Sequence, residues 1–173
     1  MSYEGPIMSA QDTFEPTPDN ARAFRNALGR FATGVTVVTC QSENGPMGIT
    51  ANSFSSVSLD PPLVMWCPAK TSKRFKAFTE CRSFAIHVLG MDQKFIGDAF
   101  AKEPHAFDDM EWEEAEDGTP LLTAPIARFH CTPHACHDGG DHVIAVGRVT
   151  EVALRDGEPL LFASGKYGRL AEI

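Results

Sequence analysis

Small polar side chains are concentrated in one short stretch, "GITANSFSSVS", which runs from Gly48 to Ser58. Strict strand alternation leaves neither face of this stretch apolar, so it does not read as an ordinary buried strand. Short hydroxyl and amide groups let a ligand approach the backbone closely, and they offer both donors and acceptors. The pattern is therefore typical of an edge that meets a flat polar heterocycle or a phosphate. A solvated edge strand, in which serine limits aggregation, is the alternative that the residues alone leave open.

A second candidate is the basic segment "KTSKRFKAF", in which Lys70, Thr71 and Ser72 precede a predicted helix. If the helix begins near Ser72 or Lys73, its free backbone N–H groups and its dipole favour a bound phosphate. The segment is a basic island in a chain of net charge −8. An ordinary capped helix with a solvated basic face explains the same residues.

His142 is the third candidate, at the start of the predicted strand in "GGDHVIAVGRV". A histidine at the mouth of a strand can donate a hydrogen bond to a carbonyl or phosphate, or move a proton. A surface or core histidine without chemistry is the other interpretation.

Two further kinds of site receive less support from the sequence. The segment from His130 to His142 is rich in His and Cys, but it has neither a CxxC pair nor an HxxxH pair, so we predict no metal and keep a metal-stabilised Cys/His protein as a minor alternative. A Ser-His-Asp hydrolase is disfavoured because the chain has no GxSxG motif.

Composition limits the class of protein. The chain has 173 residues, of which 43% are hydrophobic and 22% charged, as expected of one globular domain. The net charge of −8 argues against nucleic acid, and no apolar run approaches the roughly 18 residues of a membrane span. Met1–Ala10 lacks the features of a secretory signal, and the five cysteines are an odd number, so we expect reduced thiols in the cytoplasm.

The elements predicted to position these groups are mostly short strands. We expect a flexible tail over residues 1–16 and a single domain over 17–173. Helices are predicted over 17–31, with Ala21, Phe24, Leu28 and Phe31 on one face, and over 71–81 and 91–103. Strands are predicted over 34–40, 48–58, 61–67, 83–90, 124–133, 141–154 and 159–167, with tight turns at Asn44-Gly45 and Asp138–Asp141. Because strands and helices do not alternate, a small barrel is favoured over a βαβ sheet.

Taken together, these segments resemble a known family, the short-chain flavin reductases. The resemblance is carried by "FRNALGRFATGVTVVT", "GITANSFSSVSLDPPLVMWC", "KTSKRFKAF", "GGDHVIAVGRV" and "PLLFASGKYGRL", in one order from about Phe24 to Leu170. It implies a mainly β fold, a homodimeric six-stranded FMN-binding split barrel of Greek-key type with a few flanking helices. It also implies reduction of FMN or FAD by NADH, with NADPH possible, and delivery of reduced flavin to a separate monooxygenase. A flavin-binding storage or electron-transfer protein is the alternative within this fold.

The resemblance also implies roles for individual residues. Hydride transfer needs no protein nucleophile, because the cofactors carry the chemistry. His142 is implied to face the nicotinamide. The residues implied to contact the cofactors are Thr50, Ala51, Asn52 and Ser53 at the flavin ring, Ser55, Ser56 and Val57 beside the ribityl chain and phosphate, Lys70, Thr71 and Ser72 at the phosphate, and Phe100 and Tyr167 closing over the site.

Overall fold

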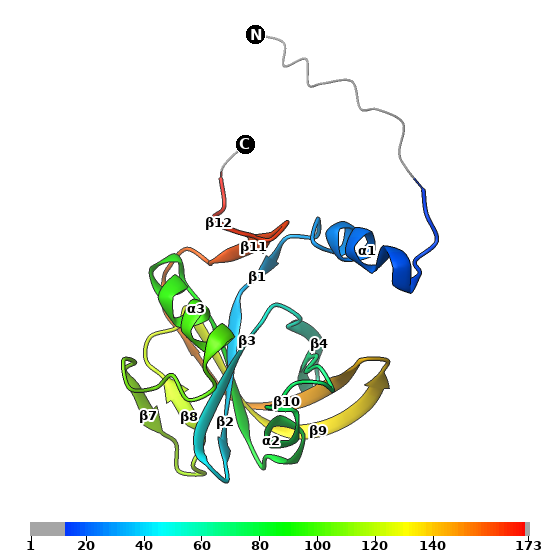
Figure 1. The fold of residues 1–173 in the computed structure, drawn as a ribbon. Coiled ribbons are helices and arrows are strands. Elements are labelled where there is room, and N and C mark those ends of the chain that lie inside the picture. The colour runs from blue at the N-terminus through cyan, green and yellow to red at the C-terminus, as the bar shows by residue number, and fades with distance from the viewer. Residues whose placement is uncertain (1–12, 172–173) are drawn as a thin grey trace.

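The computed structural model describes residues 13–171 as a mainly β protein with a few short helices (Figure 1). This confirms the predicted class, a mainly β fold with a few helices. The helical elements are η1 (Pro18–Asn20), α1 (Ala21–Leu28), α2 (Phe75–Glu80), η2 (Met91–Gln93) and α3 (Lys94–Lys102). The tail expected over residues 1–16 lies mostly outside the described residues. No helix within the described range is long and apolar enough to cross a bilayer.

The principal sheet has seven antiparallel strands in the order β3-β2-β6-β9-β10-β5-β4. Its strands are β2 (Thr36–Ser42), β3 (Gly45–Ala51), β4 (Ser55–Leu59), β5 (Pro62–Trp66), β6 (Phe84–Val88), β9 (Ala127–Gly139) and β10 (His142–Leu154). A second sheet joins β1 (Thr33–Gly34), β11 (Leu161–Ala163) and β12 (Lys166–Gly168), and β7 (Trp112–Glu114) pairs with β8 (Pro120–Leu122).

The expected six-stranded split barrel differs from the observed main sheet, which has seven strands and does not close on itself. The two edges of the main sheet are β3 and β4, and no ladder joins them within residues 13–171. They are nevertheless consecutive in the chain, separated only by Asn52–Phe54. Because so short a link connects opposite edges, the sheet must curl, and Figure 1 shows it wrapped around with β4 facing β3.

This arrangement also corrects the single strand predicted over 48–58. Ala51 pairs with Thr36 of β2, whereas Ser55 pairs with Met65 of β5, so the chain changes partner in between. A bulge between Ser56 and Ser58 interrupts β4 as well. Apolar and polar side chains do not alternate over residues 48–58, because this stretch forms parts of two edge strands rather than one continuous strand.

All three predicted helices are present, but their bounds and the burial of their apolar residues differ from the prediction. The apolar residues of α1 are not buried in the described chain. The helix predicted over 71–81 is only Phe75–Glu80, with Phe78 buried and Phe75 half-buried. The helix predicted over 91–103 is confirmed as η2 followed by α3.

Two clusters of buried side chains hold the layers together. Alternate residues of β2 point to opposite sides, so that Val38 belongs to one cluster and Val37 to the other. In the first cluster α2 contributes Phe78, whose ring meets Trp66 edge-on at 5.1 Å. In the second, α3 contributes Phe100, which lies under the segment that leads into β7.

At Gly48, strand β3 packs directly against the ring of Phe100 from α3. A Cβ built on Gly48 would lie 2.5 Å from two ring carbons of Phe100. We expect Gly48→Ala to destabilise the fold by about 1–3 kcal/mol, the usual cost of overpacking a core. Chemical denaturation measures this, with Gly34→Ala as the control because its Cβ would meet nothing within 4 Å. Equal stabilities of the two variants would contradict the packing described here.

Candidate active site

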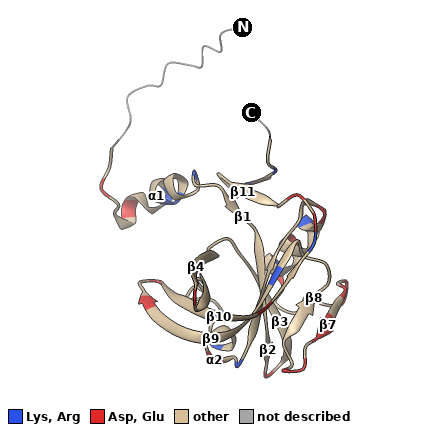
Figure 2. Ribbon diagram, turned by 180° about the vertical axis from the view of Figure 1, so that it is seen from behind, with Lys and Arg blue, Asp and Glu red and all other residues tan. Residues whose placement is uncertain are grey.

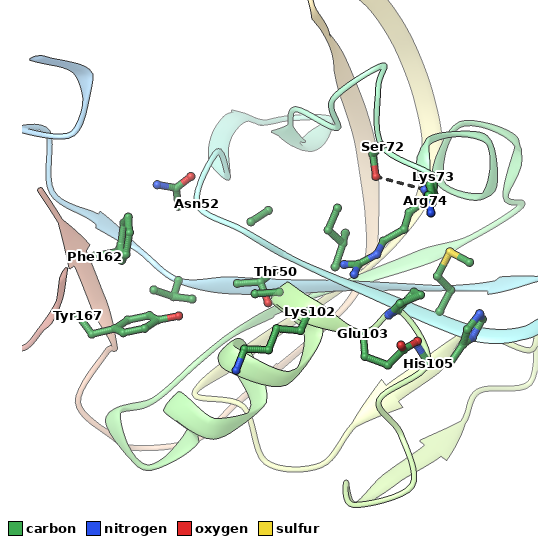
Figure 3. A pocket seen from close by; sticks show the side chains of 16 residues that line it. Thr50, Asn52, Ser72, Lys73, Arg74, Lys102, Glu103, His105, Phe162 and Tyr167 are labelled. Carbon is green, nitrogen blue, oxygen red and sulfur yellow. Dashed lines mark hydrogen bonds between the residues drawn. The ribbon is translucent and has the colours of Figure 1, made fainter. Parts of the chain in front are cut away.

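A cleft of about 910 Å³ runs along the free edge of β3 (Figure 3). This is the size of an ordinary small-molecule site. One end is aromatic and the other is cationic, with β3 between them. Its principal lining residues are Ile49, Thr50, Ala51, Asn52, Ser72, Lys73, Arg74, Lys102, Glu103, His105, Phe162 and Tyr167.

The backbone of β3 supplies the wall of the cleft. The N–H of Gly48 points away from β2 and donates to the carbonyl of Pro104 at 2.8 Å. Backbone groups alternate along a strand, so the N–H and C=O of Thr50 also point away from β2, toward the cleft. Neither has a backbone partner among residues 13–171. Since the Thr50 hydroxyl donates to the Gly97 carbonyl at 2.6 Å, it is this backbone edge that remains for a ligand.

The cationic end of the cleft comes from the segment before α2 and from the end of α3. The N–H of Arg74 donates to Ser72 Oγ at 3.2 Å, and Arg74 Nη1 donates to the Phe100 carbonyl at 2.6 Å. Burial lowers the pKa of Arg74, an effect that Glu103 partly offsets. An arginine remains charged under such a shift, so Arg74, Lys73 and Lys102 bring positive charge to this end. None of these three residues was predicted from the sequence as a site residue.

The aromatic end is formed by Phe162 of β11 and Tyr167 of β12. Their rings meet at 67° with centroids 5.4 Å apart, and Lys94 Nζ lies 4.5 Å from the centroid of Tyr167. Burial and the neighbouring Asp98 carboxylate raise the pKa of Tyr167. The phenol is therefore protonated at neutral pH. Phe162 lay in a predicted strand but was not singled out.

His142 lies in a second cavity of about 450 Å³ that shares the Ile49–Asn52 wall with the cleft. Its Nδ1 is 2.8 Å from Asp141 Oδ1. A carboxylate only accepts, so Nδ1–H donates and Nε2 is left for a ligand. Ser53 also lines this cavity, where its Oγ accepts from the N–H of Cys67 at 2.9 Å. The structure thus brings His142 and the serine-rich segment together.

Several predicted residues lie elsewhere. Lys70 is ion-paired with Asp138 at 2.7 Å, and Thr71 is exposed, so neither lines the cleft. The helix that was to present its N-terminus to a phosphate starts later and has only six residues. Phe100 has no exposed surface, because its ring fills the space beside Gly48. Ser55, Ser56 and Val57 belong to β4 and line neither cavity.

The Cys/His segment forms one long hairpin of β9 and β10 with its turn at Gly140. His130 Nε2 lies 3.0 Å from Asp117 Oδ2 and 3.2 Å from Thr119 Oγ1, and Cys131 is buried. His137 and Cys136 are exposed on the outer part of the hairpin. Within residues 13–171, no three His, Cys, Asp or Glu side chains are grouped as metal ligands would be.

A free strand edge in a cleft with one cationic and one aromatic end suits a ligand that carries both a flat heterocycle and a phosphate. The flavin reductase like domain matches residues 28–171, and the chain belongs to that family. The FMN reductase (NADH) SmoA of Agrobacterium fabrum is 52% identical over 164 residues, which cover 95% of this chain and 94% of SmoA. The reductase subunit HsaB of a flavin-dependent monooxygenase from Rhodococcus jostii is 40% identical, covering 84% of this chain and 76% of HsaB.

Solved structures agree with this membership. The NADH:FAD oxidoreductase SgcE6 of Streptomyces globisporus matches with a TM-score of 0.86 at 36% identity, covering 95% of this chain and 96% of SgcE6. SgcE6 has also been solved in complex with NAD and FAD fragments. The family resemblance seen in the sequence is therefore confirmed.

Proposed function

We propose that this protein is an NADH-dependent flavin reductase that reduces FMN or FAD and supplies the reduced flavin to a separate monooxygenase component. The observation that carries the proposal is the free backbone edge at Thr50, which opens on a cleft with cationic and aromatic ends. The relatives named as an FMN reductase (NADH) and as a monooxygenase reductase subunit support both the reaction and the oxygenase partner.

The residues of the cleft fit a flavin mononucleotide. The N–H and C=O of Thr50 match the alternating donors and acceptors on the edge of a flavin ring, with Ala51, Asn52 and Ser53 continuing that wall. Ser72, Lys73, Arg74 and Lys102 suit the phosphate, because cations and hydroxyls bind phosphate oxygens. When bound, the flavin accepts a hydride from the nicotinamide. The chain's own task is to hold the two rings in contact and to limit access of water.

For His142 we propose a positioning role toward the nicotinamide. The Asp141 carboxylate fixes the tautomer, so that Nε2 is left as an acceptor on a residue that lines the same cavity as Asn52. We expect His142→Ala to raise the KM for NADH about fivefold, as loss of one hydrogen bond does, and to slow flavin reduction without changing flavin affinity.

Stopped-flow reduction and flavin fluorescence titration together measure this. His137→Ala is the matched control, because His137 is an exposed histidine of the same hairpin. Unchanged turnover of His142→Ala at every NADH concentration would contradict a positioning role for His142.

The experiment that tests the proposal compares FMN, FAD and riboflavin as acceptors, each with NADH and with NADPH. Continuous oxidation of the nicotinamide under air, with NADH the better donor, supports a reductase. A flavin that binds but is never reduced supports the storage or electron-transfer alternative. Elemental analysis of the purified protein tests the metal-stabilised alternative, because less than one equivalent of zinc or iron per chain would exclude it.

A homodimer is part of the same proposal. Large apolar side chains are exposed on α1 and on the edge strand β4, among them Phe24, Leu28, Val57 and Leu59, the last 96% exposed. Apolar patches of this kind mark association surfaces. We expect light scattering to give twice the chain mass of 18.8 kDa, and a monomer would contradict this.

The five free cysteines are consistent with a cytoplasmic setting.

A further inference from the structure

Two cysteine thiols that are far apart in the sequence meet where α2 ends against β2. Cys40 lies in β2 and has no exposed surface. Cys81 directly follows α2, where its N–H donates to the Ala77 carbonyl at 3.1 Å. Cys81 packs against the cluster of buried side chains to which Cys40 belongs. The contact between the two thiols is direct, because each is a hydrogen-bond partner of the other.

The two thiols differ in their access to solvent. Cys81 is partly exposed and lines a cavity of about 260 Å³ between α2 and the turn that joins β2 to β3, whereas Cys40 lies behind it in the core. Although the chain as a whole is acidic, equal numbers of lysine and glutamate side chains line this cavity, namely Lys73, Lys76, Glu43 and Glu80 (Figure 2). A small oxidant in solution therefore reaches Cys81 first, and the charges around the cavity balance.

The contact also sets which of the two thiols ionises. The pKa of Cys81 is lowered, chiefly because the Cys40 thiol donates a hydrogen bond to it, although burial opposes this effect. The same contact, together with burial, raises the pKa of Cys40. Since the thiolate is the reactive form of cysteine, Cys81 is the nucleophile of the pair. A partly exposed cysteine of lowered pKa beside a second thiol is typical of cysteines that react with peroxide.

The proposed function supplies such an oxidant. Reduced flavin that is not consumed by an oxygenase reacts with dioxygen, which yields oxidised flavin and hydrogen peroxide. Peroxide is therefore formed in the solution around this protein whenever NADH is oxidised without a coupled acceptor.

We propose that Cys81 and Cys40 form a peroxide-sensitive site that becomes a disulfide when reduced flavin is lost to dioxygen. The Cys81 thiolate attacks one oxygen of hydrogen peroxide, the O–O bond breaks, and the other oxygen leaves as water after taking up a proton. The Cys40 sulfur then attacks the Cys81 sulfenic acid, the S–O bond breaks, and a second water leaves. In sum, two thiols lose two hydrogen atoms, and one peroxide is reduced to two waters. The identity of the oxidant's source rests on the proposed function.

The first experiment adds hydrogen peroxide to the full-length protein with FMN and without NADH, and then maps the alkylated peptides by mass spectrometry. We expect a disulfide between Cys40 and Cys81, a loss of two thiols from the five of the untreated chain, and full recovery with dithiothreitol. Cys40→Ala should leave a sulfenic acid on Cys81 that dimedone traps. Cys81→Ala should leave Cys40 reduced, because Cys40 is buried. Cys136→Ala removes an exposed thiol and is the control, in which the disulfide should form as in the wild type.

Oxidation of wild type that is confined to Cys136, or that stops at a sulfenic acid on Cys81, would overturn the inference. The second experiment replaces added peroxide by NADH and FMN under air, with and without catalase. We expect the disulfide to accumulate during NADH oxidation and catalase to suppress it. NADH oxidation without the disulfide would overturn the assigned source of the oxidant. A protein that added peroxide cross-links but that does not oxidise NADH would instead contradict the proposed function.

Discussion

Replacing Ser53 with leucine is expected to weaken flavin binding by about one to two orders of magnitude. The added bulk would enter the space beside Asn52, where the cavity of His142 adjoins the cleft. Overpacking such a site costs about 1–3 kcal/mol, and each 1.4 kcal/mol is a factor of ten in the dissociation constant. Quenching of flavin fluorescence on titration with each variant measures the constant.

Two control variants isolate the effect of bulk at this position. Ser53→Ala removes the hydroxyl that accepts from the Cys67 N–H but adds no volume, so its flavin affinity should fall much less. Ser58→Leu adds the same volume farther along β4, outside both cavities, and should bind flavin normally. Wild-type affinity in Ser53→Leu would show that the flavin does not lie along this segment.

Acidification is expected to destabilise the protein through His87. The side chain has no exposed surface. Its Nδ1 lies 3.0 Å from the Val37 carbonyl, and its Nε2 accepts from the Leu122 N–H at 3.0 Å. Burial, with a smaller contribution from the nearby Arg128, lowers the pKa of His87 from 6.5 to about 3. The neutral ring thus joins β6 to β2 and to β8.

The direction of the change in stability follows from the pKa of His87 in the unfolded chain and in the folded protein. Below pH 6.5 the unfolded chain takes up a proton at His87, whereas the folded protein does not do so until about pH 3. Stability is therefore full above pH 6.5 and is lost as the pH falls toward 3. The expected loss of unfolding free energy from this residue is about 2 kcal/mol between pH 7 and pH 5.

Urea denaturation at the two pH values measures this loss. His87→Gln cannot titrate, so its stability should differ between pH 7 and pH 5 by about 2 kcal/mol less than that of the wild type. His134→Gln removes an exposed histidine and serves as the control. The same pH difference in wild type and His87→Gln would contradict the assignment.

The sequence predicted best those features that depend on neighbouring residues. The turns at Asn44-Gly45 and Asp138–Asp141 are confirmed, with positive φ at Gly45 and Gly140, because such turns require residues that tolerate that conformation. The strand that leads from the second turn and the helix over 91–103 were also found, since periodicity and glycine signals are local.

Features that depend on long-range pairing could not be predicted in this way. Nothing near Asn52 in the sequence shows that β3 and β4 occupy opposite edges of the sheet. The ion pair of Lys70 with Asp138 joins residues that are distant in the sequence. The burial of Phe100 depends on its contact with Gly48, a neighbour that only the fold provides.

The chain transfers reducing equivalents from NADH to a flavin, which we propose to lie along Thr50–Ser53. The most direct measurement is anaerobic mixing of the protein, FMN and one equivalent of NADH, followed by the visible absorbance of the flavin. We predict rapid bleaching with wild type and slow bleaching with Ser53→Leu, while Ser58→Leu matches the wild type. A wild-type mixture in which FMN keeps its colour would contradict this prediction.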